Sequence, residues 1–312
     1  MTRLHDLYLQ GGQSPWLDNL KRSYLRDGRL QSLLDAGIRG VTSNPTIFAK
    51  AIEGEDDYDE EFCDLVATKT VEEAYWDMVV GDVAEAAGLL RPLHAQSQGS
   101  DGFVSIEVAP ELAHDEDATV EAATELHARL RLPNVLVKIP ATPEGVRAIR
   151  RMVATGHSIN VTLIFGLDRY LEVIDAYLAG LEELAASGRD LSGVASVASF
   201  FVSRVDTEVD RRLESLAGAG RPAGAPDPLA LRGRAAVANA KLAYQAFRER
   251  FRGPRWEALA ARGARLQRPL WASTSTKNPA YPDLVYVDNL VGPDTVNTMP
   301  DATVEAFLDH GR

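Results

Sequence analysis

One lysine, Lys138, lies near the end of an apolar run, residues 134–140 (NVLVKIP). The run holds β-branched or bulky aliphatic residues without polar alternation, which is typical of a strand buried on both faces of a parallel sheet. Burial disfavours the charged ammonium and favours a nucleophilic amine that can form a Schiff base with a carbonyl. Only 6 of the 33 basic residues are lysines, and arginine cannot supply a free amine. An edge-strand lysine that points at solvent explains this run alone equally well.

Polar side chains lie near the ends of most other strand candidates as well. The ends of parallel strands meet on one face, so these side chains would gather around Lys138. The full set at these positions is Asp18, Asn44, Glu107, Lys138, Asn160, Thr162, Ser199 and Ser273. A single carboxylate such as Glu107 or Asp18, taken alone, is more simply a helix cap or a surface residue. The hypothesis of a site therefore rests on the joint pattern.

Schiff-base aldol chemistry gives each of these residue types a task. The Lys138 amine attacks a ketone, and Glu107 with Thr162, through a water, delivers a proton as water leaves the carbinolamine. A second carboxylate, Asp18, takes the proton of the C4 hydroxyl as the C3–C4 bond breaks. Arg204, which alone is more simply a solvated helix arginine, follows the sixth strand and suits a phosphate. The remaining expected substrate contacts are Asn44, Asn160 and Ser199 for hydroxyl groups, Phe201 for closing the pocket, and Lys277 for the phosphate.

The order of elements indicates a (β/α)8 TIM barrel of the α/β class, a single domain over residues 1–312 with extra helices. Helical periodicity fills the intervals between strands, and we expect single helices at 19–36 and 228–251. The acidic run 53–61 predicts a solvated loop and helix start, because it lacks the spacing of a calcium loop. Residues 217–228, rich in Gly, Pro and Ala, read as an insertion after the sixth strand. The strand candidates are 13–18, 40–44, 103–107, 134–140, 158–165, 193–201, 268–274 and 284–290.

Composition limits the partners. The net charge of −12 and the pI near 5.0 argue against nucleic acid and anionic membranes. Cys63 is the only cysteine, which excludes an intramolecular disulfide and a cysteine-based zinc site and favours a reducing cytoplasm. The first residues lack the apolar core of a signal peptide, and no apolar run approaches the length of a transmembrane helix. We expect a cytoplasmic protein that is a monomer or a homodimer.

Several stretches resemble the transaldolase family in its longer bacterial form, in the family's order. The most specific are TSNP within residues 37–48 and VLVKIP within 134–146, and the others are 104–115, 159–165, 196–206 and 270–300. The resemblance implies a class I transaldolase of the pentose phosphate pathway, without cofactor or metal. Such an enzyme moves a dihydroxyacetone unit from sedoheptulose 7-phosphate or fructose 6-phosphate to glyceraldehyde 3-phosphate or erythrose 4-phosphate.

The same resemblance implies roles for individual residues. Lys138 is similar to the family's Schiff-base lysine, and Asp18 to its general base. Two departures are Pro15, where we expect an aliphatic residue, and Ser275, where a glycine is usual beside Lys277. Members of this branch are also expected to continue for several helical turns past residue 312. The remaining implied assignments are Glu107 with Thr162 as the acid/base pair, and Asn44, Asn160, Ser199, Phe201 and Arg204 as substrate contacts.

Three other interpretations remain open at the level of sequence. A simple Schiff-base aldolase on the same barrel would release the three-carbon unit instead of holding it for an acceptor. A pathway-specific transaldolase would use a different acceptor sugar. A non-catalytic sugar-phosphate-binding barrel would be expected to have lost the amine or a carboxylate, yet Lys138, Glu107 and Asp18 are all present.

Overall fold

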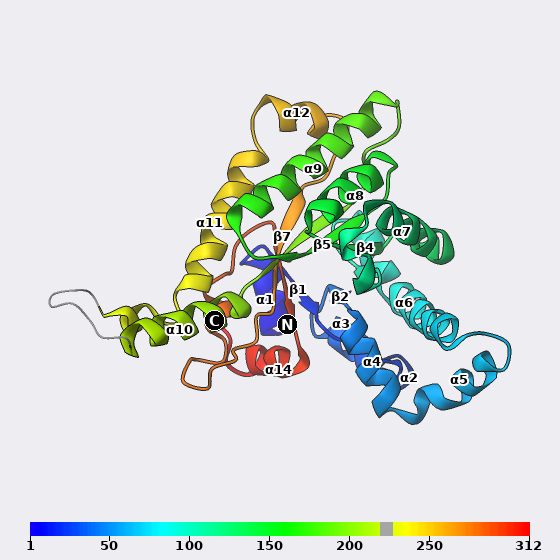
Figure 1. The fold of residues 1–312 in the computed structure, drawn as a ribbon, viewed down its shortest axis with the longest axis horizontal. Coiled ribbons are helices and arrows are strands. Elements are labelled where there is room, and N and C mark those ends of the chain that lie inside the picture. The colour runs from blue at the N-terminus through cyan, green and yellow to red at the C-terminus, as the bar shows by residue number, and fades with distance from the viewer. Residues whose placement is uncertain (219–226) are drawn as a thin grey trace.

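The computed structural model describes residues 1–218 and 227–312, which form a closed barrel of eight parallel strands. The strands follow one another around the barrel in chain order, and the last pairs with the first. Helices surround the strands (Figure 1), so the predicted (β/α)8 class is confirmed. The strands are Gln13–Leu17 (β1), Gly40–Thr42 (β2), Phe103–Glu107 (β3), Val135–Pro140 (β4), Ile159–Ile164 (β5), Ser196–Phe201 (β6), Gln267–Ala272 (β7) and Thr295–Met299 (β8).

The helices begin at recognisable caps. Thr142 and Asp115 accept hydrogen bonds from backbone N–H groups in the first turns of α8 and α7, and Pro143 occupies the first position of α8. The α-helices of the described residues are Arg3–Leu9 (α1), Arg22–Arg26 (α2), Arg29–Asp35 (α3), Pro45–Gly54 (α4), Asp59–Val66 (α5), Val71–Gln96 (α6), Glu116–Leu130 (α7), Pro143–Ala154 (α8), Leu167–Ala186 (α9), Ser203–Gly218 (α10), Ala235–Arg250 (α11), Pro254–Ala260 (α12), Val285–Asp288 (α13) and Asp301–His310 (α14). Short 3-10 helices are Asp56–Tyr58 (η1), Pro110–His114 (η2) and Pro228–Leu231 (η3).

The predicted eighth strand at 284–290 is wrong. Residues 285–288 form the helix α13, and Tyr286 and Val287 pack against the outer core. The strand lies further on, at Thr295–Met299. A short apolar run cannot be assigned to strand or helix by periodicity alone, and the true strand is inconspicuous because three of its five residues, Thr295, Asn297 and Thr298, are polar although buried. Asn297, for example, accepts a hydrogen bond from Thr274 at 2.9 Å.

Two helix predictions also need correction. The expected helix at 19–36 is divided into α2 and α3 at Gly28, whose φ of +77° a helix cannot continue through. The expected helix at 228–251 is η3 followed by α11. The acidic run 53–61 contains the predicted helix start, that of α5, but the end of α4 and the 3-10 helix η1 take the place of the predicted loop. Of the insertion predicted at 217–228, residues 219–226 lie outside the described residues.

The core has two layers. The larger one lies between the strands and the surrounding helices, and the smaller one fills the barrel interior. Gly40 permits this inner packing, since a Cβ there would lie 2.4 Å from the Trp16 ring. The inner layer comprises Trp16, Phe103, Leu136, Ala195, Val197, Leu270, Ala272 and Val296. These side chains separate a smaller cavity of about 230 Å³ at the N-terminal ends of the strands from a larger one of about 470 Å³ at their C-terminal ends.

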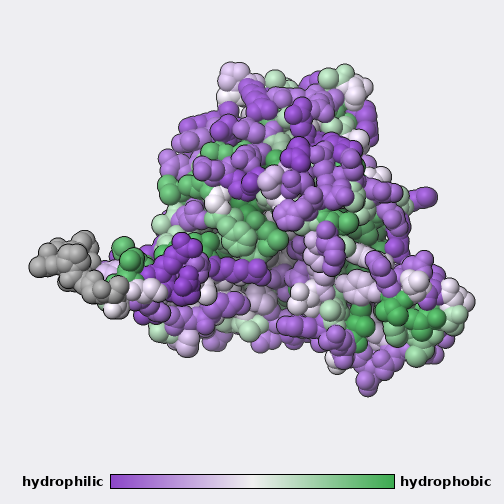
Figure 2. Space-filling view, in the orientation of Figure 1, coloured by the Kyte–Doolittle hydropathy of each residue, from purple (hydrophilic) through white to green (hydrophobic). Residues whose placement is uncertain are grey.

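The two ends of the chain lie together (Figure 1), where the Arg3 guanidinium donates to the carbonyl oxygens of Leu308 and Gly311 at 2.9 and 3.1 Å. The face seen in Figure 2 is mostly hydrophilic, with hydrophobic residues in separate patches. Within the described ranges, no helix combines the length and apolarity needed to cross a bilayer.

Candidate active site

The register of the strands brings Lys138 between two other predicted residues. Glu107 of β3 pairs with Lys138 of β4, and Lys138 pairs with Asn160 of β5. Leu136 belongs to the inner core, and alternation along the strand puts Lys138 on the same inward face. Lys138 is only 6% exposed. The interpretation as a solvent-facing edge lysine is therefore wrong, because a closed barrel has no edge.

Two acceptors hold the Lys138 ammonium. Its Nζ lies 2.9 Å from Oε2 of Glu107 and donates to the carbonyl oxygen of Ser43 at 2.9 Å. The Ser43 hydroxyl in turn donates to the carbonyl oxygen of Ser105 at 2.6 Å. The amine therefore has a fixed direction, and the carboxylate nearest to it can take its proton before the amine attacks a carbonyl.

Asp18 follows β1 on the floor of the same cavity. Burial raises the pKa of Asp18, while the charge of Lys138 and a hydrogen bond from Thr42 oppose the increase. The Thr42 hydroxyl lies 2.7 Å from Oδ1 of Asp18 and 2.6 Å from the hydroxyl of Thr298. A carboxylate whose protonated form is favoured in this way is a stronger base once it is ionised.

Asn160 and Ser199 form a hydrogen-bonded pair beside Lys138. The Ser199 hydroxyl donates to Oδ1 of Asn160 at 2.7 Å, and Nδ2 of Asn160 donates to the Ser105 hydroxyl at 3.0 Å. Asn160 is fully buried and does not line the cavity, so it orients Ser199 from below. Thr162, two residues further along β5, lines the cavity and is also buried.

A cavity of about 470 Å³ opens above these residues at the C-terminal ends of the strands. Of the ten residues predicted for the site, all except Asn160 line it. Asn44 is the N-cap of α4 and its Oδ1 accepts from the Ile47 N–H at 3.0 Å, which leaves its amide nitrogen for a substrate. The lining residues that bear charge are Lys50, Lys138, Arg204 and Lys277 on the positive side and Asp18 and Glu107 on the negative side. The cavity therefore carries net positive charge in a protein of net charge −12, which favours an anionic ligand.

Two apolar side chains of the cavity lining are Leu163, in an irregular end of β5, and Phe201 of β6. The register shifts between Val161 and Ile164, and Leu163 has a φ of +60° and is 40% exposed. A positive φ is costly for a leucine, and such strain is typical of functional sites. The Phe165 and Phe201 rings lie 5.2 Å apart by their centroids, and the Arg204 guanidinium lies 4.9 Å from the Phe201 ring.

The predicted phosphate residues lie at the mouth of this cavity on two different elements. Arg204 is in the first turn of α10, and Lys277 is in the segment that follows β7. Both are exposed. Ser275, the departure noted in the sequence, accepts a hydrogen bond from Lys277 Nζ at 2.7 Å, so the substitution for glycine adds a contact to this lysine.

Several residues of the site were missed in the sequence. Thr42 and Thr298 support Asp18, the Ser43 carbonyl holds Lys138, and Lys50 adds a cation at the mouth. A signal existed for Thr298, because the stretch TVNTM lies between the turn residues Gly-Pro-Asp and a proline. The other contacts depend on barrel closure and have no local signal.

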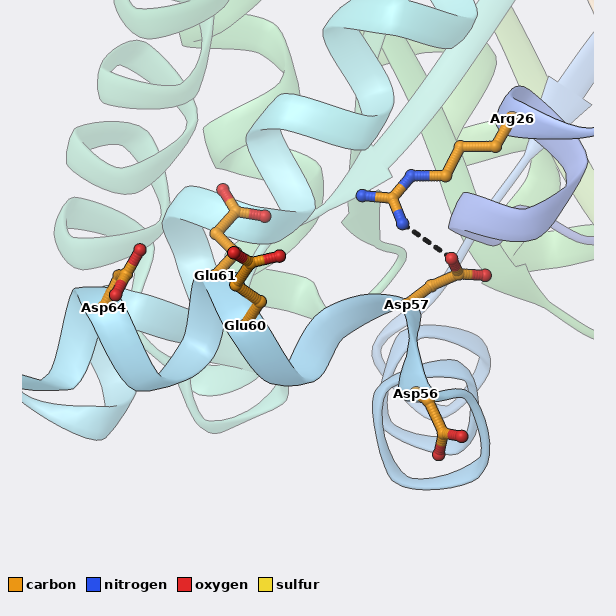
Figure 3. Close-up of a pocket in the computed structure, with 6 residues that line it drawn as sticks. All are labelled: Arg26, Asp56, Asp57, Glu60, Glu61 and Asp64. Carbon is orange, nitrogen blue, oxygen red and sulfur yellow. Dashed lines mark hydrogen bonds and ion pairs between the residues drawn. The ribbon is translucent and has the colours of Figure 1, made fainter.

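A second cavity, shown in Figure 3, is lined by the acidic run and Arg26. Arg26 pairs with Asp57 at 2.6 Å, whereas Asp56 and Asp64 lie at opposite ends of the group (Figure 3). Within residues 1–218 and 227–312, no three acidic, histidine or cysteine side chains are grouped so as to hold a metal ion.

The fold and the main cavity define a class: a (β/α)8-barrel protein whose site, at the C-terminal end of the barrel, combines a buried amine with two carboxylates. Residues 15–312 match the family model described as Transaldolase/Fructose-6-phosphate aldolase. The chain belongs to the transaldolase family, and it is an enzyme, a transferase.

Relatives named as transaldolases agree with this assignment. The chain is 53% identical to Transaldolase 1 of Streptomyces avermitilis over 96% of its own length and 78% of the relative. It is 52% identical to the transaldolase of Frankia alni, over 96% of the chain and 80% of the relative, and 52% identical to that of Mycobacterium ulcerans, over 96% and 79%. The resemblance stated from the sequence is confirmed.

Proposed function

We propose that the chain transfers a dihydroxyacetone unit from a ketose phosphate to an aldose phosphate through a Schiff base on Lys138. The observation that carries the proposal is the position of the Lys138 amine, 2.9 Å from Glu107 in a cavity that Asp18 also lines. The donors would be sedoheptulose 7-phosphate or fructose 6-phosphate, and the acceptors glyceraldehyde 3-phosphate or erythrose 4-phosphate.

The first half of the reaction forms the covalent adduct. Glu107 takes a proton from the Lys138 ammonium, and the free amine attacks the C2 carbonyl of the donor, so that a C–N bond forms. The carbinolamine hydroxyl must then leave as water. Glu107 returns a proton to that hydroxyl, with Thr162 and a water as relay, and the iminium results.

The second half breaks the carbon chain. Asp18 takes the proton of the C4 hydroxyl, the C3–C4 bond breaks, and its electron pair moves into the iminium to give an enamine. The C4 oxygen becomes the carbonyl of the aldose that leaves. Burial raises the pKa of Asp18, which strengthens it as a base for this step. The positive iminium acts as the electron sink, so the scheme needs neither a cofactor nor a metal.

Transfer requires the enamine to persist until an acceptor enters. Ser199, oriented by Asn160, and the amide of Asn44 would hold the hydroxyl groups of the three-carbon unit. The Phe201 ring, which lines the cavity and packs against Phe165 with the centroids 5.2 Å apart, would limit access of water. With the acceptor bound, the steps run in reverse: the enamine carbon attacks the aldehyde carbon of the acceptor to form the new C–C bond, and water then releases the product from Lys138.

The charges of the cavity support phosphorylated substrates. Arg204, Lys277 and Lys50 are exposed cations that line its mouth. These three cations outnumber the two carboxylates of the cavity, Asp18 and Glu107, so the mouth attracts a phosphate group. We further infer a cytoplasmic enzyme that is a monomer or a homodimer. Its one cysteine, Cys63, is free and exposed, which suits a reducing compartment.

Product partition tests the proposal against a simple aldolase. Purified enzyme is given fructose 6-phosphate with and without erythrose 4-phosphate, and both free dihydroxyacetone and sedoheptulose 7-phosphate are measured over time. Transfer should exceed release by at least about tenfold if the enamine is held. Release that equals or exceeds transfer would make the protein an aldolase. Lys138→Arg, which keeps a cation beside Glu107, is the matched control and should form neither product.

A further inference from the structure

The two cations Arg204 and Lys277, here called the rim cations, belong to separate elements. Arg204 lies on α10, and Lys277 lies in the segment between β7 and α13. A phosphate held by both would depend on how these elements are fixed to each other. Backbone contact between them is limited to their first residues, where the Ser203 N–H donates to the carbonyl oxygen of Ser273 at 3.0 Å.

Hydrogen bonds within the segment that carries Lys277 connect its two ends. The Thr276 hydroxyl lies 3.0 Å from the carbonyl oxygen of Pro282 and 2.8 Å from that of Asp283. The Tyr281 N–H donates to the carbonyl oxygen of Asn278 at 3.1 Å. These contacts brace the segment internally, and it is tied to two neighbouring helices: Asp283 lies 3.2 Å from His310 of α14, and the contacts with α10 are the ones nearest to Lys277.

Two tyrosine hydroxyls supply the attachment to α10, one from the segment itself, Tyr281, and one from the helix α13 that follows it, Tyr286. Tyr281 donates to Oδ2 of Asp210 at 2.6 Å, and Tyr286 donates to Oδ2 of Asp206 at 2.9 Å. Both carboxylates lie on α10, in the turns that follow Arg204, and both are at least nine-tenths buried. We call these contacts the tyrosine–aspartate pairs.

The other oxygen of each carboxylate fixes a third segment. Oδ1 of Asp210 accepts from the Gly233 N–H at 3.0 Å, and Oδ1 of Asp206 accepts from the Ala236 N–H at 2.8 Å. Gly233 has a φ of +67°, and a Cβ there would lie 2.9 Å from the Tyr281 ring. The ring thus packs directly on this glycine, which orients the hydroxyl toward Asp210.

The tyrosine–aspartate pairs lie directly behind the mouth of the active site. A cavity of about 190 Å³ is lined by Asp206, Asp210, Tyr281 and Tyr286, and Lys277 lines both this cavity and the active-site cavity. Lys277 thus lies between the phosphate end of the active-site cavity and the tyrosine–aspartate pairs.

We propose that the tyrosine–aspartate pairs are positioning groups that set the separation of the rim cations and thereby the preference for phosphorylated over unphosphorylated sugars. The inference rests on the proposed function for the identity of the substrates. Removing one hydroxyl releases the segment without changing charge. The rim should then grip a phosphate less well, while chemistry at Lys138 continues.

Tyr281→Phe tests this, because the ring still packs on Gly233. We expect kcat/KM for fructose 6-phosphate to fall about three- to tenfold, the usual effect of one hydrogen bond, through KM and with kcat unchanged. The value for unphosphorylated fructose should not change. Tyr244→Phe is the matched control, since its hydroxyl binds the Pro293 carbonyl oxygen at 3.1 Å, and it should match the wild type with both sugars.

A purely structural role would lower kcat/KM for both sugars equally in Tyr281→Phe, and that result would overturn the inference, as would no effect at all. Asp210→Asn separates position from charge. If charge alone mattered, this variant would bind inorganic phosphate more tightly while Tyr281→Phe bound it normally, which would also overturn the inference.

Calorimetry with inorganic phosphate distinguishes failure of the inference from failure of the proposed function. Phosphate binding that weakens in Tyr281→Phe, in a wild-type protein that forms no adduct with either sugar, would reject the function and retain the positioning role. A wild type that binds no phosphate would reject the positioning role whatever its activity.

Discussion

Protonation of His127 should destabilise the fold as the pH falls from 6.5 towards 4. The imidazole lies near the end of α7, its centroid is 4.7 Å from that of His157, and its Nε2 lies 3.1 Å from the carbonyl oxygen of Ser158. A carbonyl only accepts, so Nε2 carries the proton of the neutral ring. Burial, with a smaller repulsion from His157, lowers the pKa of His127 from 6.5 to about 4.

The magnitude follows from this difference in pKa. As the pH falls, the unfolded chain binds the proton first, so the stabilising contribution is complete above pH 6.5 and is lost as the pH approaches the folded value. Between pH 7.5 and 4.5 the loss amounts to about 2.5 kcal/mol, at 1.36 kcal/mol per pH unit. That is a large share of the stability of an ordinary domain.

His127→Gln removes the titration and keeps a donor for the Ser158 carbonyl on a residue that suits a helix. Guanidinium unfolding at pH 7.5 and 4.5 should show the variant losing about 2.5 kcal/mol less than the wild type. Carboxylates that titrate in the same range act in both proteins and cancel in the comparison. His114→Gln, at a side chain that is 81% exposed, is the control and should follow the wild type. Equal losses in His127→Gln and the wild type would refute the reasoning.

Two substitutions in the active site give further predictions. Asp18→Asn should lower the transfer rate about 10²- to 10⁴-fold, as expected for loss of a general base. It should also raise the melting temperature at pH 7.5. Burial raises the pKa of Asp18 in the folded protein above its value in the unfolded chain. The contribution of Asp18 to folding stability is therefore complete below the unfolded pKa and is lost as the pH rises through the folded pKa. A lower melting temperature together with a normal kcat would contradict both predictions for Asp18→Asn. Glu107→Gln should slow formation of the adduct while substrate still binds, as rapid-quench borohydride trapping measures; normal trapping rates would remove its acid/base role.

Much of the floor of the site was predictable because it lies on regular strands. Glu107 and Lys138 each lie at or near the end of a buried strand, and the period of two along a strand determines which side chains share the inward face. The barrel rule then brings strand ends together without any knowledge of contacts. This is why Asp18, at the end of a weaker strand candidate, was also found.

The residues that were missed depend on closure and on irregular backbone. Ser43 acts through its carbonyl, which no side-chain pattern reveals, and Leu163 reaches the mouth only through the bulge in β5. Thr298 was missed because a short apolar run, residues 284–290, competed with the true strand β8. The His127 and His157 rings are in contact between α7 and the turn before β5, and their separation of thirty residues in the sequence gives no indication of it.

Borohydride trapping with fructose 6-phosphate, followed by peptide mass spectrometry, tests the central claim most directly. We expect a reduced three-carbon adduct on the peptide that contains Lys138, and depletion of that adduct when erythrose 4-phosphate is added. A folded, active protein with no adduct on Lys138, or with an adduct on another lysine, would contradict it.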